Sequence, residues 1–123
     1  WDDHEVMDNW SWGKDLTAED RYTEKSIEFL SERAARAFHE MMPIRHLPGD
    51  PLRVHRKIAY GPLLDVFFLN LRRYRGPNGA SLETTLTPHS SILGKHRLAW
   101  LCKALQASTA TWKVIASDMP IAL

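Results

Sequence analysis

This chain of 123 residues has a single cysteine, almost no excess of charge and no long hydrophobic run. Its one cysteine, Cys102, excludes an internal disulfide and any zinc site built from several cysteines. Sixteen Lys and Arg oppose fifteen Asp and Glu, so no strong field attracts nucleic acid or an anionic membrane. Apolar runs such as residues 66–69 are far too short to span a bilayer. We therefore expect a globular chain whose partners are selected by local sites.

The two ends of the chain suggest a piece of a longer protein. No Met begins the sequence, and no charged-then-apolar leader with a small-residue cleavage site is present. A site-like cluster starts at residue 1, with no scaffold before it. We therefore expect parts of the protein to lie on both sides of this sequence, and no feature indicates an oligomeric state.

Apolar periodicity predicts two helices. A long one is expected over about 18–42, with Thr17 and Asp20 as a loose capping box and Pro43 as its stop. A second is expected over about 94–106, where Leu101 and Leu105 flank Cys102 and predict a packed core thiol.

Strand signals lie between and after these helices. A hairpin is expected over about 52–71, with Gly61-Pro62 between its strands and a second strand that is apolar on both faces. A further strand is expected over about 112–117, and the polar, broken stretch 72–91 predicts a long loop. Strands that need cover on both faces, served by two helices, leave apolar surface without a partner. The pattern therefore indicates an α/β fold of which this chain holds only a part.

The first six residues, Trp1-Asp2-Asp3-His4-Glu5-Val6, place acids and an imidazole between apolar neighbours. Carboxylates in a partly buried site become neutral unless a positive charge compensates them. Such a cluster therefore points to a cation, and a metal ion is the natural candidate.

Five segments, in order along the chain, resemble the alkaline phosphatase D family, a branch of the calcineurin-like metallophosphoesterases. They are Trp1-Asp2-Asp3-His4-Glu5-Val6 with Asn9-Trp10, Pro51-Leu52-Arg53, Leu71-Arg72-Arg73-Tyr74-Arg75, Leu98-Ala99-Trp100-Leu101, and the stretch 108–120 around Trp112-Lys113-Val114. The resemblance implies a fragment of a two-sheet α/β sandwich, with metal ions at the carboxyl ends of strands. The resemblance also implies that residues 1–123 form a partial catalytic domain whose N- and C-terminal parts are missing.

The same resemblance implies a function. It predicts metal-dependent hydrolysis of phosphate monoesters or diesters, two or more metal ions with iron and calcium as the family's ions, and export to the periplasm or the extracellular space. The natural substrate stays open. Because the fragment holds few ligands, we expect it to be inactive alone.

Residue roles follow from matching Asp-Asp-His-Glu to the superfamily's Gly-Asn-His motif. By that match Asp3 is a metal ligand and His4 acts on the phosphate as a proton donor or charge stabiliser. Asp2 is the alternative ligand, because in an extended strand Asp2 and His4 share a face; the Asp3 assignment requires a turn at Asp3. Asn9 matches a recurrent family Asn that contacts metal or phosphate.

Two arginines at a strand end complete the candidate set. Arg73 and Arg75 stand where the hairpin runs into the long loop, a geometry suited to holding a substrate phosphate. Asn70 precedes this segment where the family usually has Asp, which leaves a charge role there open.

The same residues allow other roles. Arginines interleaved with tyrosines in residues 53–75 could form a nucleic-acid strip, although the neutral charge balance disfavours it. A structural module and a degenerate, inactive family member are further readings. Surface or capping roles are expected for five histidines: His39, His46, His55, His89 and His96.

Overall fold

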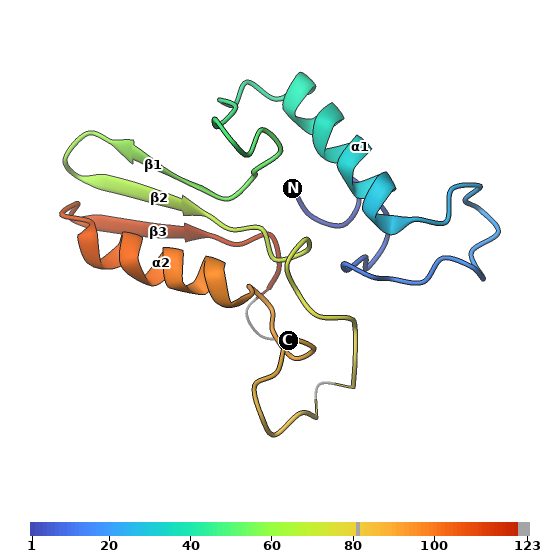
Figure 1. The fold of residues 1–123 in the computed structure, drawn as a ribbon. Helices are drawn as coiled ribbons and strands as arrows, with labels where there is room; N and C mark the ends of the chain where they lie inside the picture. Colours follow the sequence, from blue (N-terminus) through green and yellow to red (C-terminus); the bar gives the residue numbers. More distant parts are fainter. Residues whose placement is uncertain (81, 121–123) are drawn as a thin grey trace.

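The computed structural model describes residues 1–80 and 82–120 and places two helices and three strands in them (Figure 1). Helix α1 spans Ile27–Met41 and α2 spans Lys95–Ala107. Strands β1, β2 and β3 span Arg56–Tyr60, Leu64–Phe68 and Trp112–Ala116. The α/β class and all five predicted elements are therefore confirmed, with shifted boundaries.

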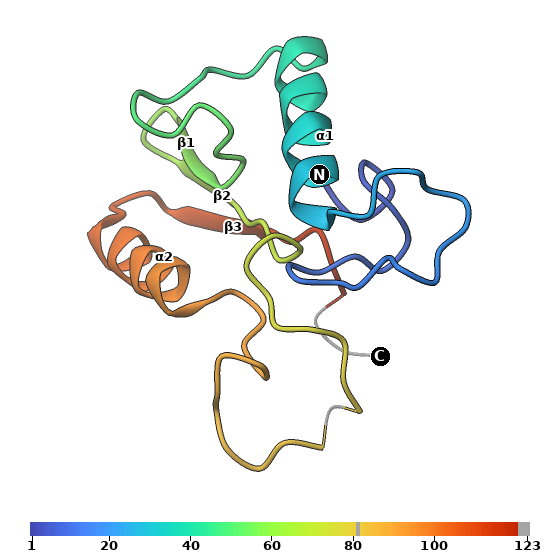
Figure 2. The ribbon, with the colours of Figure 1, turned by 45° about the vertical axis from the view of Figure 1, so that its right-hand side comes forward.

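The three strands form one sheet in the order β1-β2-β3. β1 and β2 are an antiparallel hairpin in which Ile58 faces Val66, and β2 and β3 are parallel with Val66 beside Val114. A parallel pair needs a long crossover, and here the crossover contains the segment 69–94 and α2. Figures 1 and 2 show that this segment swings away from the strand ends before it returns to α2.

Helix α1 begins nine residues later than the sequence predicted. Ser26 is extended and its hydroxyl accepts a hydrogen bond from the backbone N–H of Phe29, so Ser26 is the N-cap. Thr17 caps no helix: its backbone N–H and its hydroxyl both donate to the carboxylate of Asp15, and the residues that follow it form turns. The end is as predicted: Met42 is extended before Pro43, as a residue preceding proline prefers.

The hairpin is shorter than the predicted 52–71. Before β1, the Arg56 guanidinium donates to the carbonyls of Arg45, Arg53 and Val54, so this stretch bends back on itself and does not pair with β2. After β2, the N–H of Leu69 donates to the carbonyl of Ala116 and extends the contact with β3 only.

The two faces of the sheet differ in their cover. On the face that carries Phe67, this ring is fully buried and Asp65 pairs with Lys57, with 2.6 Å between Nζ and Oδ2. On the other face Ile58, Phe68 and Val114 remain exposed. Within the described residues β2 is therefore covered mainly on one face, and the expectation that the sheet leaves apolar surface without a partner is confirmed.

A separate core joins the N-terminal segment to α1. Met7, Trp10, Leu16 and Ile27 are buried together, and partly buried side chains pack around them. In Figures 1 and 2, α1 lies beside this N-terminal segment and away from α2. This core positions the acidic cluster next to the ends of the strands.

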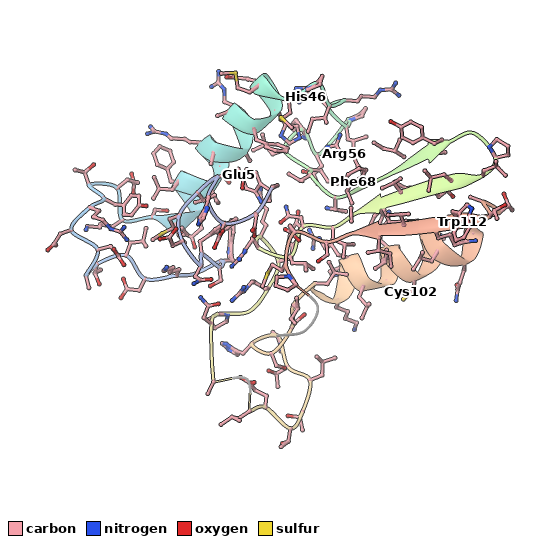
Figure 3. The ribbon with its side chains drawn as sticks, turned by 180° about the vertical axis from the view of Figure 1, so that it is seen from behind. Glu5, His46, Arg56, Phe68, Cys102 and Trp112 are labelled. Atoms are coloured by element: carbon pink, nitrogen blue, oxygen red, sulfur yellow. The ribbon has the colours of Figure 1, made fainter. Side chains whose placement is uncertain are left out.

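Cys102 is exposed on α2, so the predicted core thiol is wrong (Figure 3). Successive helix residues are separated by about 100°, and the position that α2 buries is Leu101. None of the helices in the described part of the chain is long and apolar enough to cross a membrane.

Candidate metal and phosphate site

The chain turns sharply at the start of the acidic cluster. The carbonyl of Asp3 accepts hydrogen bonds from the N–H groups of Val6 and Met7, each at 2.8 Å. Ahead of this turn, the Trp1 ring packs edge-on against Trp10 and Phe38, with centroid distances of 6.2 and 5.4 Å. The turn at Asp3 that the ligand assignment requires is therefore present.

His4 projects from this turn into solvent and faces two carboxylates. Its Nε2 lies 3.2 Å from Asp8 Oδ1 and 3.7 Å from Asp3 Oδ1, and 81% of the side chain is exposed. An imidazole in this position lies beside Asp3 and within reach of a ligand from solvent.

One buried arginine gathers the polar side chains of the cluster. Arg72 Nε donates to Asp2 Oδ1 at 2.9 Å, Nη2 lies 3.3 Å from Asp3 Oδ2, and Nη1 donates to Asn9 Oδ1 at 3.5 Å. The Arg72 side chain is only 7% exposed. A guanidinium has donors in a fixed fork, so one side chain can orient all three oxygen groups.

Arg72 was not among the sequence-predicted residues. The available signal was its position directly after the apolar stretch of β2, in a run of three arginines, in a chain whose first residues carry unpaired acids. The bend after β2 decides which of the three arginines turns toward the acids. Residue patterns alone do not specify that bend.

Asn9 closes the turn from the other side. It is in the left-handed region with φ of 51°, which asparagine tolerates better than most residues. Its N–H donates to Asp3 Oδ2 at 3.0 Å, and its carbonyl accepts a hydrogen bond from Asn78 Nδ2 at 2.8 Å. The backbone of Asn9 therefore holds Asp3 in place, while its side chain meets Arg72.

These contacts keep Asp3 ionised. The N–H of Asn9 lowers the pKa of the Asp3 carboxyl most, burial acts against this, and the charges of Arg72 and His4 lower it further. The group is thus a carboxylate across the whole neutral range, as a hard-cation ligand must be.

The cluster lies at the carboxyl ends of β2 and β3 (Figure 1). There the Asp118 carboxylate accepts the N–H of Leu71 with both oxygens, at 3.0 and 3.2 Å. Burial raises the pKa of Asp118, and the nearby charge of Asp2 raises it further, so a third acid lies close to the cluster. Asp118 is a neighbour that the sequence prediction missed, since it follows β3 at the far end of the chain.

Arg73 and Arg75 do not join the Arg72 cluster. The Arg73 guanidinium lies 5.6 Å from the centre of the Trp12 ring, and Arg75 Nη1 donates to the sulfur of Met119 at 3.4 Å. Burial lowers the pKa of Arg75 and the charge of Arg72 lowers it further. Asn70, where the family usually has Asp, accepts the N–H of Arg73 with its side-chain oxygen and is buried, so here it supports the turn.

Two histidines are misassigned by the sequence. His39 and His55 are both buried, whereas surface or capping roles were expected. His39 bonds through Nδ1 to the carbonyl of Ala35 one turn earlier on α1, and His55 packs edge-on against Tyr74 and Trp100. Each ring is amphipathic, so its polar atoms do not prevent burial against aromatic neighbours.

Within residues 1–80 and 82–120, no group of three or more His, Cys, Asp or Glu is placed so that it could hold a metal ion. What the chain brings together is one corner of oxygen donors: two carboxylates and an amide oxygen around Arg72.

Comparisons with known proteins agree on one family. The family model of PhoD-like phosphatases matches residues 1–123. Alkaline phosphatase D of Bacillus subtilis (strain 168) is 34% identical over 133 residues, an alignment that includes 97% of this chain and 21% of that protein. A solved structure described as the structure of PhoD matches 95% of this chain and 24% of that one, with a TM-score of 0.68 and 31% identity. The chain thus spans about a fifth of the length of the curated relative.

Proposed function

The chain belongs to the PhoD-like phosphatase family, and from this premise we propose that the protein carrying it hydrolyses phosphate monoesters or diesters with the help of metal ions. Residues 1–123 are then part of its catalytic domain. We further propose that the protein is exported and that this stretch alone is inactive, because it holds only one corner of the site.

The observation that carries the proposal is the arrangement around Arg72. Two carboxylates and one amide oxygen from the N-terminal turn meet a buried guanidinium at the carboxyl ends of two parallel strands. Ligand sites in α/β sheets lie at this edge. Burying a guanidinium is costly unless it is paired, and Arg72 is paired with acids that converge at this edge, which supports a functional site.

The chemical type of the donor atoms fits a hard cation. Asp2 and Asp3 offer carboxylate oxygens, Asp3 is held ionised, and Asn9 offers an amide oxygen. These donors are too few to complete a coordination sphere within the described residues. When bound, a metal ion would supply charge neutralisation and a water of lowered pKa. Asp3 is the proposed ligand, with Asp2 as the second candidate.

The remaining residues have roles that need no bound group. His4, exposed beside Asp3, would donate a proton to the leaving oxygen or hydrogen-bond the phosphate. Asn9 fixes Asp3 through its N–H and would contact the substrate phosphate through its side chain. Arg73 and Arg75 would hold the substrate from the adjoining loop.

Substitutions in the protein of family length test the assignment. We expect Asp3→Ala to lower the bound metal measured by elemental analysis and to abolish hydrolysis of bis(4-nitrophenyl) phosphate. We expect His4→Ala to retain the metal while kcat falls by about a hundredfold or more, the usual contribution of a general acid.

Two exposed residues provide matched controls. Asp20→Ala removes a carboxylate and His89→Ala an imidazole outside the cluster. Wild-type metal content and turnover in Asp3→Ala and His4→Ala would refute the assigned roles. Absence of both metal and turnover in the unaltered protein would refute the function.

A further inference from the structure

A groove rich in arginine lies beside the Arg72 cluster and is not explained by metal binding. It consists of two adjoining hollows of about 490 and 390 Å³, within the range of small-molecule sites. Arg97 and Asp50 line both hollows, so the two form one continuous surface, which we call the arginine groove. Its other lining residues are Trp12, Arg53, His55, Arg73, Tyr74, Arg75, His96 and Trp100.

The four arginines of the groove have no carboxylate partner among the residues that the structure describes. The Arg97 guanidinium lies 3.5 Å from the centre of the Tyr74 ring, and Arg73 lies over Trp12. Arg53 Nε donates to the carbonyl of His55. Guanidiniums stacked on rings keep N–H groups at their edges available for an oxyanion.

The groove has an excess of positive charge. Asp50 is its single carboxylate, against four guanidiniums. The α2 helix starts at the groove, with His96 and Arg97 in its first turn, no acid there, and no side-chain hydrogen bond at the Gly94 cap. A helix amino end carries partial positive charge, which adds to that of the arginines.

His55 supplies an independent sign of a missing partner. It is only 6% exposed and lines the groove, and its Nδ1 is buried without a hydrogen-bond partner in the described part of the chain. A buried polar atom normally has a partner. Its environment holds the ring neutral, so the charge of the groove comes from arginine.

We propose that the arginine groove binds a phosphate group that does not react: either a further phosphate of the substrate, held while the scissile ester lies at the Arg72 cluster, or free inorganic phosphate. Arginine forks match phosphate oxygens in geometry, and a dianion suits a groove with several guanidiniums and one carboxylate. Arg75 lines the groove and follows Arg72 by three residues in the chain, so the groove adjoins the segment that carries the cluster. The substrate form of the proposal rests on the proposed function.

Binding of inorganic phosphate tests the groove without any turnover. Calorimetric titration in the family-length protein, in an Asp3→Ala background that weakens binding at the catalytic corner, gives the affinity. We expect Arg97→Gln and Arg53→Gln each to weaken phosphate binding by about tenfold, the loss of one charge-assisted contact. The control is Arg36→Gln, an exposed arginine paired with Glu40 on α1. Equal phosphate affinity in all three folded variants, checked by circular dichroism, would overturn the proposal.

A pair of substrates then separates the two sources of phosphate. Thymidine 5′-(4-nitrophenyl phosphate) and its 3′-phosphorylated form differ by one phosphate, and the initial rate of 4-nitrophenol release reports cleavage of the 5′ ester alone. If the groove serves the substrate, the 3′-phosphate lowers KM in the Arg36→Gln protein, and Arg97→Gln removes this advantage with kcat unchanged. If the two substrates have equal KM while Arg97→Gln weakens inorganic phosphate, the groove serves free phosphate. If neither substrate turns over, the proposed function fails and the titration still decides the groove.

Discussion

Arginine serves two different purposes in two adjoining regions of this chain. Arg72 is buried and its donors reach Asp2, Asp3 and Asn9, so its charge is compensated inside the molecule. The arginines of the groove lie against aromatic rings and backbone, with no carboxylate partner among the described residues. The residue type alone therefore does not define the role of an arginine; the presence of a carboxylate partner does. A compensated arginine organises the protein's own acids, and an uncompensated one retains capacity for an external anion.

The largest difference between the two regions is expected in stability. Replacing Arg72 with Ala leaves partly buried Asp3 and half-exposed Asp2 without their cation, which should lower the free energy of unfolding by about 3 kcal/mol. Replacing Arg97 with Ala removes only a stacking contact on Tyr74, and should cost less than about 1 kcal/mol. Urea denaturation of the two variants measures the difference.

A triple variant sharpens this result. Removing the carboxylates as well, in Arg72→Ala with Asp2→Ala and Asp3→Ala, should restore part of the lost stability, because no acid is then left unpaired. Equal losses in Arg72→Ala and Arg97→Ala would mean that the two regions do not differ as the contacts indicate.

The second largest expected effect is a loss of folding stability at low pH, caused by His55 in the arginine groove. Burial, followed by the charges of Arg53 and Arg97, lowers the pKa of His55 from 6.5 to about 4. The unfolded chain therefore takes up a proton at His55 near pH 6.5 that the folded chain refuses until about pH 4, so stability falls as the pH falls through this window. The full shift corresponds to about 3 kcal/mol, and screening by solvent in the open groove reduces our expectation to about 2 kcal/mol.

Comparison with His55→Phe isolates this contribution, since the ring is kept and the titration is removed. Protonation of Asp118, whose pKa is raised, acts in the opposite direction in both proteins and cancels in the difference. Urea denaturation at pH 7 and pH 4.5 should show the larger loss in the wild type. Parallel losses in the two proteins would contradict the assignment.

The smallest effect separates the two functions of Asn9. Its N–H holds Asp3 and its side chain meets Arg72, in a backbone conformation with φ of 51°. We expect Asn9→Ala to destabilise the chain by about 1 kcal/mol, because Ala is strained in the left-handed region. Asn9→Gly removes the same side chain without that strain and should cost less. Thermal unfolding distinguishes the two, and equal losses would place the whole effect in the Arg72 contact.

The elements could be predicted from the sequence because apolar periodicity marks them, but their ends depend on local hydrogen bonds. Thr17 and Ser26 are both plausible caps; Ser26 accepts the N–H of Phe29, while Thr17 forms a local turn by donating to Asp15. The start of β1 was likewise decided by Arg56, whose guanidinium binds nearby carbonyls. Such side-chain competition for the backbone leaves no periodic signal.

The candidate site was predictable only on the acid side. Asp2, Asp3, His4 and Asn9 are near one another in sequence, so one turn brings them together. Arg72 and Asp118 lie about 70 and 115 residues away and reach the same place through the ends of β2 and β3, a matter of tertiary structure. His39 and His55 were misjudged because a ring on a polar stretch can still turn inward against aromatic neighbours.

Asp118 has a consequence for how the sheet opens. Its carboxylate takes the place that a backbone carbonyl would occupy opposite the N–H of Leu71, which is buried. The parallel strands β2 and β3 can therefore separate beyond Ala116 without leaving the N–H of Leu71 unsatisfied. One side chain thus satisfies the backbone donor where the two strands separate, and an apolar residue at position 118 would leave the N–H of Leu71 without this acceptor.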